Sequence, residues 1–157
     1  MLKERPKKLN AYLAGIVDAE GSFSISMKKQ DDTRYGWVID PVFSVSLHKD
    51  NKDVLETLRN AMTCGRVIEK TGQDNLMVFV VDNRRQLMEK VVPFFKRNKL
   101  HIKYEDFENF ADIVTALENK EHQTKDGFIE LAKKVLSFQH AKGHRKYKLE
   151  DILSSLK

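Results

Sequence analysis

The nine residues Leu13–Gly21, LAGIVDAEG, mark the point where the sequence changes from a helical to an extended pattern. Ahead of this point, apolar residues recur at the spacing of one helix face: Leu9, Leu13, Ile16 and Val17. This spacing predicts a helix over residues 9–19, with Asn10 as its N-cap. Gly21 stands just beyond the helix, where glycine commonly ends one. The segment is therefore expected to be a helix end followed at once by a strand.

Alternating apolar and polar residues follow this glycine and predict a first strand over residues 21–28. The pattern downstream predicts five further elements: a strand over 37–47, a helix over 50–62, strands over 66–70 and 76–82, and a helix over 83–93. Together with the first helix they give the order α-β-β-α-β-β-α, which occurs once.

Caps and prolines are expected to limit these elements. Asp50 and Asn83 are predicted N-caps, and Pro93 is predicted to end its helix. Pro41 is expected at an edge or a bulge of the second strand. Beyond the seven elements, helices are predicted from Lys103 and from Thr124, and a short last helix is expected to end at Leu156 after the basic run 140–148.

Composition excludes several classes of protein. The chain has 157 residues, is 41% hydrophobic and contains nine Phe, which is enough for one folded domain over residues 1–157, with a core of about 9–118 and C-terminal helices of about 124–157. Its one cysteine, Cys64, excludes a disulfide scaffold and a cysteine-based metal cluster. No apolar run approaches the ~20 residues that cross a bilayer. We therefore expect no membrane partner and no secretion, but an intracellular location in the cytoplasm, the nucleoid or an organelle. The net charge of +5 is compatible with a nucleic-acid partner.

LAGIVDAEG resembles the signature of the LAGLIDADG homing endonucleases, with six of nine positions identical. Residues 94–110 and the segment KEHQTKDGF at 120–128 resemble further segments of that family. The resemblance implies an α+β protein with the αββαββα core, additional C-terminal helices and a four-stranded antiparallel DNA-binding sheet. Because the motif occurs once, it also implies the homodimeric type, with the two copies joined through the LAGIVDAEG helix.

The resemblance also implies an active site at the end of this helix. Glu20 would be the catalytic acid and a metal ligand, joined by the carbonyl oxygen of Ala19, and Mg²⁺ is the expected ion, with Mn²⁺ or Ca²⁺ able to substitute for binding. Lys103 would be the catalytic lysine, with Lys96 and Lys99 as alternatives. The expected dimer-interface residues are Leu13, Ala14, Gly15, Val17 and Asp18, and Asp18 is expected to have a structural role. The alternative is an ordinary amphipathic helix with an exposed terminal acid.

Strand alternation predicts a polar outward face that would contact DNA. Its members are Ser24, Ser26, Lys28, Ser44, Ser46, Arg66, Ile68, Lys70, Asn75 and Met77, with Gln30 and Arg34 added at a hairpin tip. Arg66 or Lys70 would bond guanine, Asn75 would pair with adenine, and Ile68 and Met77 would touch thymine methyl groups. The alternative is a sheet face that is merely solvated.

These expectations favour a site-specific, intron-encoded endonuclease that hydrolyses a phosphodiester in each strand of a long pseudo-palindromic target. An RNA-binding intron maturase and a non-cleaving DNA-binding regulator of the same fold are the alternatives. The presence of Glu20 and Lys103 favours the nuclease. The residue that orders the attacking water is left open, because Leu47 stands where one branch of the family has a polar residue.

Overall fold

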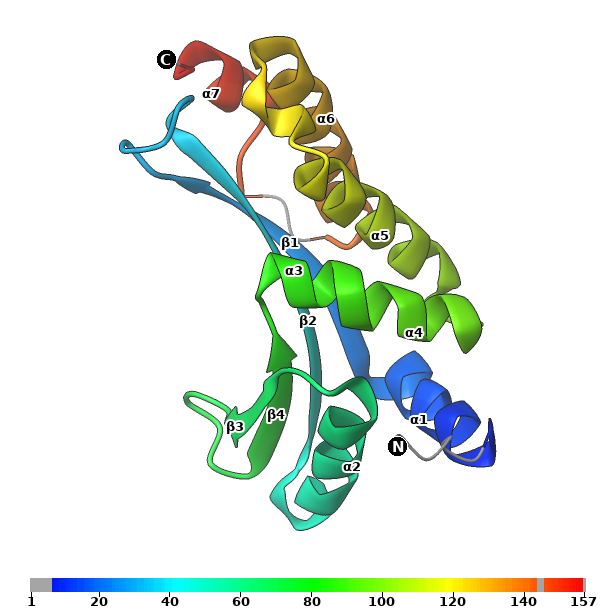
Figure 1. Ribbon diagram of the computed structural model, residues 1–157. Helices are drawn as coiled ribbons and strands as arrows, with labels where there is room; N and C mark the ends of the chain where they lie inside the picture. Colours follow the sequence, from blue (N-terminus) through cyan, green and yellow to red (C-terminus); the bar gives the residue numbers. More distant parts are fainter. Residues whose placement is uncertain (1–6, 144–145, 157) are drawn as a thin grey trace. The chain divides into compact units, whose positions relative to one another are not determined.

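The computed structural model describes residues 7–143 and 146–156. The chain divides into two compact units, one of residues 1–23 and 42–107 and the other of residues 24–41 and 108–157. The strands form one four-stranded sheet in the order β1-β2-β4-β3 (Figure 1). The predicted α+β class and αββαββα order with additional C-terminal helices are confirmed.

The motif helix passes directly into the first strand. Helix α1 (Lys7–Glu20) ends where strand β1 (Gly21–Lys29) begins. A Cβ atom on Gly21 would lie 2.6 Å from the carbonyl oxygen of Val17, so the junction requires glycine, as predicted. The prediction of Asn10 as N-cap is wrong, because α1 begins three residues earlier and Asn10 lies within it.

The middle of the chain supplies the other three strands. They are β2 (Trp37–His48), β3 (Arg66–Glu69) and β4 (Leu76–Val81), and helix α2 (Lys52–Met62) contacts the β3–β4 hairpin (Figure 1). Both pairings of β4 are antiparallel. Pro41 precedes the stretch of β2 that pairs with β4, which begins at Phe43, so its missing N–H does not interrupt that pairing.

Two predicted helix limits differ from the structure. Asp50 does not cap α2, because it lies inside a 3₁₀ turn (Lys49–Asn51) whose cap is the ring of His48. Pro93 does not end its helix, because it lies in the first turn of α4 (Val92–Arg97), where a missing N–H is tolerated. A π-helical turn (Leu87–Val91) joins α4 to α3 (Arg84–Gln86), and the predicted cap of α3 is confirmed: Asn83 accepts a 3.0 Å bond from the Gln86 N–H.

The remaining helices are α5 (Tyr104–Glu118), α6 (Lys125–Ala141) and α7 (Leu149–Ser154). The helix predicted to begin at Thr124 begins one residue later, because Thr124 is the N-cap of α6 and its hydroxyl accepts a 3.1 Å bond from the Gly127 N–H. In the basic run 140–148, His140 still belongs to α6, and residues 144 and 145 lie outside the described residues. No helix within residues 7–143 and 146–156 is long and apolar enough to cross a membrane.

An aromatic cluster forms the core behind the motif. Phe23, at the start of β1, stacks on Phe43 at 5.1 Å between ring centroids and meets the edge of Phe95 at 5.8 Å. Phe95 and Phe23 both contact Phe107 of α5 at 5.7 Å. All four rings are buried, so the strand that follows α1 is fixed against α4 and the first turns of α5.

Candidate active site and nucleic-acid interface

The last turn of α1 carries the predicted acid. Glu20 is the final residue of the helix, and both Glu20 and Ala19 are exposed. A carboxylate here faces the negative end of the helix dipole, at a cost of ~0.3–1 kcal/mol when exposed. The last turn of α1 contains no basic residue that would offset this cost. A cation close to the Glu20 carboxylate would lower it.

Asp18 has a structural role, as expected, but within its own chain. Its carboxylate accepts bonds from three successive backbone N–H groups, with shortest distances of 3.1 Å for His101, 2.9 Å for Ile102 and 2.9 Å for Lys103. Burial raises the pKa of Asp18, but these three hydrogen bonds outweigh burial and leave its pKa below the ordinary value. The carboxylate is thus committed to the segment that leads into α5.

Lys103 returns to the end of the motif helix. Its Nζ donates to the carbonyl oxygens of Asp18 at 2.8 Å and of Ala19 at 3.2 Å. Lys99 instead lies over the ring of Tyr104 at 4.6 Å, and Lys96 is exposed on α4. Of the three lysines considered from the sequence, Lys103 is therefore the one that the structure brings to the end of α1.

The donors at this helix end fit part of a metal shell. The described residues contain no group of three or more His, Cys, Asp or Glu that could hold a metal ion. The Glu20 carboxylate and the Ala19 carbonyl are oxygen donors, the type that Mg²⁺ prefers, and Mg²⁺ commonly binds one or two carboxylates while keeping waters and phosphate oxygens. One protomer thus offers a partial shell that substrate and solvent would complete.

The expected interface residues divide between core and surface. Leu13 and Val17 are fully buried within the protomer and Ala14 is nearly so, which leaves these side chains little or no surface for a second protomer. Asp18 is occupied as described above. Gly15 is exposed, and a Cβ atom added to it would meet no atom within 4 Å. Of the five residues expected at the interface, Gly15 is therefore the one that its own protomer leaves exposed.

The register of the first unit corrects the outward face of its sheet. Arg66 and Ser44 both lie opposite Val80, and Ile68 lies opposite Val78, so these residues share the outer face as predicted. Met77 was wrongly assigned to that face. It pairs with Leu47 and Glu69, and therefore has the parity of the buried Phe79.

The neighbouring predicted residues lie around the β3–β4 turn. The backbone N–H of Lys70 donates to the carbonyl oxygen of Leu76 at 2.9 Å, which continues the outer parity of Arg66 and Ile68. Asn75 is exposed and precedes β4, where its carbonyl oxygen accepts a 2.8 Å bond from Lys49 N–H. Strand alternation therefore does not fix the face of Asn75. Ser46, opposite Val78, keeps its outer position.

In the second unit, several predicted DNA contacts have partners within the chain. Lys28 pairs with Asp40 at 2.8 Å, and Arg34 donates to the Gln123 carbonyl oxygen at 2.7 Å. Ser26 lies 3.4 Å from the carbonyl oxygen of Asp40. Ser24, Lys28 and Gln30 are exposed, which leaves the hairpin accessible.

Two acids on the outer face were missed by the sequence analysis. Asp40 neutralises Lys28, and Asp82 forms a bidentate pair with Arg66. Period-two alternation places Asp40 on the strand face opposite to the buried Ile39, and Asp82 follows Val80 by two residues, so the acid positions were visible in the sequence. Their partners were not visible, because they depend on strand register.

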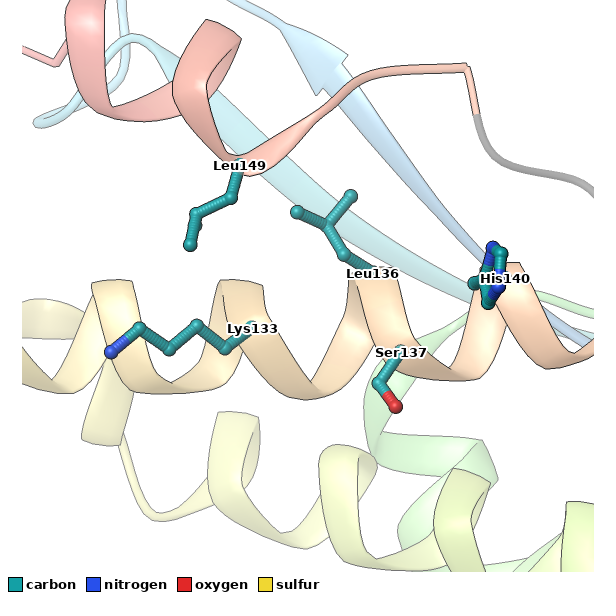
Figure 2. A pocket seen from close by; sticks show the side chains of 5 residues that line it. All are labelled: Lys133, Leu136, Ser137, His140 and Leu149. Atoms are coloured by element: carbon teal, nitrogen blue, oxygen red, sulfur yellow. The ribbon is translucent and has the colours of Figure 1, made fainter.

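Two surface cavities lie apart from these predicted residues. One, of about 260 Å³, is in the second unit; Figure 2 shows Leu149 and Leu136 lining it together with Lys133, Ser137 and His140. The other, of about 370 Å³ in the first unit, is lined by Arg59, Asn60, Thr63, Cys64, Gly65 and Gln86. Neither lining includes a predicted site residue.

Comparison with known proteins agrees with this geometry. Residues 13–114 match the family model described as LAGLIDADG endonuclease. The chain is 38% identical over 149 residues to homing endonuclease I-ApeII of Aeropyrum pernix, covering 92% of this chain and 88% of that protein. It is 32% identical over 129 residues to DNA endonuclease I-CeuI of Chlamydomonas moewusii, where the match covers 80% of this chain but only 58% of the relative.

Solved structures give the same result. An archaeal intron-encoded homing endonuclease, I-Vdi141I complexed with DNA, superposes with a TM-score of 0.85 at 38% identity, covering 92% of each chain. The group I intron-encoded homing endonuclease I-CeuI complexed with DNA gives a TM-score of 0.87 at 26% identity, covering 96% of this chain and 76% of that one. Motif, fold and relatives agree, and this chain belongs to the LAGLIDADG endonuclease family.

Proposed function

We propose that this protein is a homing endonuclease. It would cut both strands of DNA at one long site that spans the insertion point of its intron. The observation that carries the proposal is the exposed end of α1, where Glu20 and the Lys103 ammonium group lie at one helix terminus. Relatives include homing endonuclease I-ApeII, and the superposed structures of I-Vdi141I and I-CeuI are complexed with DNA. Such a protein acts where its target DNA is, in the cytoplasm, the nucleoid or an organelle.

The proposed cofactor is Mg²⁺, held by the Glu20 carboxylate and the Ala19 carbonyl oxygen, with Mn²⁺ or Ca²⁺ able to replace it for binding. When bound, the ion would lower the pKa of a water and stabilise charge on the scissile phosphate. Lys103 would stabilise the same negative charge, because its ammonium group already lies 3.2 Å from the Ala19 carbonyl oxygen. Each Glu20 would serve one DNA strand.

The proposed assembly is a homodimer in which the exposed side of α1 meets its copy. This side carries Tyr12, Gly15 and Ala19, which are exposed and repeat at helical spacing. A glycine inside a helix costs about 1 kcal/mol relative to alanine, and nothing in the protomer requires it at position 15. Close approach of a second helix would account for it. A twofold axis there predicts a pseudo-palindromic target.

The proposed DNA surface is the outer sheet face, with Met77 removed by the observed register. In the second unit it comprises Ser24, Ser26, Lys28, Gln30 and Arg34. In the first unit it comprises Ser44, Ser46, Arg66, Ile68 and Lys70, with Asn75 at the turn. Antiparallel strands of this kind can enter the major groove. The serines favour water-mediated contacts at the inner positions.

The test is cleavage of DNA that carries the joined exons flanking the intron. With Mg²⁺, the wild-type protein is expected to cut both strands, whereas Glu20→Gln should bind the same DNA without cutting it. Glu105→Gln is the matched control, because Glu105 is also an exposed acid near a helix end. Binding without cleavage by the wild type would indicate a regulator, and stimulation of splicing without nicking would indicate a maturase.

A further inference from the structure

Arg66 and Asp82 form an ion pair with two hydrogen bonds on the outer face of the first unit. Nη1 of Arg66 donates to Oδ1 of Asp82 at 3.0 Å, and Nη2 donates to Oδ2 at 2.9 Å. The two side chains are 52% and 44% exposed, so the pair lies at the surface. Its geometry is the parallel two-bond arrangement that orients a guanidinium plane.

Strand register places this pair on the face proposed to read DNA. Arg66 of β3 lies opposite Val80 of β4, and Val80 lies opposite Ser44 of β2. Asp82 follows Val80 by two residues and is thus the diagonal neighbour of Arg66 across the two strands. The hydrogen bonds from Arg66 hold the pKa of Asp82 below its ordinary value. Asp82 is therefore charged and paired at neutral pH.

The chemistry of the pair leaves one edge of Arg66 available. A guanidinium group has five N–H donors, and Asp82 takes one from each terminal nitrogen. The side edge, formed by Nε–H and the second N–H of Nη2, remains a parallel pair of donors. This edge matches the O6 and N7 acceptors that guanine presents in the major groove. A lysine such as Lys70 offers a single point charge and has no such edge.

An acid on a DNA-facing surface is unfavourable unless it has a compensating role, because the phosphates are negative. The charge of Asp82 is cancelled by Arg66, and its oxygens fix the plane in which the free edge lies. Fixing that plane before binding reduces the side-chain entropy lost when the edge meets a base.

We propose that Asp82 is a positioning residue for base recognition, and that it orients Arg66 to read one guanine in each half of the DNA target. The inference rests on the proposed function, since it assigns a base to the DNA surface described there. It selects Arg66 over Lys70 as the guanine reader and adds Asp82 to the residues that determine specificity.

The experiment selects bound sites from DNA libraries in which the target is randomised one position at a time, using the full-length wild type, Arg66→Ala, Asp82→Ala, Asp82→Asn and the control Lys70→Ala. The wild type should prefer guanine at one position of each half-site by about 10-fold or more. Arg66→Ala should abolish that preference. Asp82→Ala should reduce it several-fold at the same position, while the affinity for unrelated DNA stays equal or rises.

Asp82→Asn keeps one acceptor oxygen and should retain part of the preference, whereas Lys70→Ala should leave this position unchanged. Unchanged guanine preference in Asp82→Ala, or an equal loss at every position, would overturn the positioning role. Arg66→Ala with no effect on any guanine would overturn the assignment of the reader. Failure of the wild type to select any site would instead count against the proposed function.

Discussion

The carboxylate of Asp18 joins the end of the motif helix to residues 101–103, and its removal should weaken both the fold and cleavage. In Asp18→Ala, three backbone N–H groups lose their acceptor. A hydrogen bond to a charged group contributes ~1.5–3 kcal/mol. Because Ile102 is 79% exposed, water can replace part of what is lost. We therefore expect the free energy of unfolding to fall by about 2–4 kcal/mol, less than the sum of three such bonds.

The measurement is urea unfolding of wild type and Asp18→Ala at several pH values, followed by circular dichroism. The folded-state pKa of Asp18 is lowered, so its stabilisation is complete above the unfolded-state pKa of about 3.9 and is lost as the pH falls through the folded-state pKa. The difference between the two proteins should thus be full at pH 7 and shrink below about pH 4.

Asp112→Asn is the control, because Asp112 is exposed on α5. Equal unfolding midpoints for wild type and Asp18→Ala at pH 7 would refute the reasoning. A difference that stayed constant down to the lowest pH would show that packing, rather than the charged carboxylate, had been lost.

Three further predictions concern the dimer, the lysine and the cysteine. Gly15→Leu should leave the protomer folded, because the added Cβ meets no atom within 4 Å. It should weaken dimerisation about 10-fold or more, as measured by sedimentation equilibrium. An unchanged dimer would exclude this face as the interface. Lys103→Met should slow cleavage about 100-fold or more with little change in DNA affinity, and equal rates would remove it from the site. Burial raises the pKa of the Cys64 thiol by more than the nearby positive charge of Lys90 lowers it. The thiol should therefore react with a maleimide more slowly in the folded protein than in urea.

Sequence periodicity predicted the order of elements because burial of one face dominates each of them. The sequence correctly placed β1 and β2, the two strands of the first hairpin. It also correctly placed the glycine at the α1–β1 junction. Caps were less predictable, since several polar residues near a helix start compete for the same role. Asn83 caps α3 as expected, whereas the ring of His48 replaces the predicted cap by Asp50.

The site was only partly predictable for a related reason. The motif identifies Glu20 and Asp18 from neighbouring residues, but the link from Asp18 to residues 101–103 joins segments more than eighty residues apart and depends on tertiary structure. Met77 was assigned to the wrong face because the predicted alternation of β4 was shifted by one residue relative to the observed register. The pairing of Arg66 with Asp82 likewise follows from register, which the pattern of either strand alone does not contain.

Lys103 reaches back to the carbonyl oxygens of Asp18 and Ala19, so each polypeptide carries both the Glu20 carboxylate and the Lys103 ammonium group at the same helix end. In a twofold assembly, each protomer would then supply one complete set of these reactive groups. A mixed assembly of one intact and one disabled copy should leave a nick rather than a break. Fusion of two copies into one longer gene would free each half to diverge, and its target could drift away from palindromy without loss of chemistry.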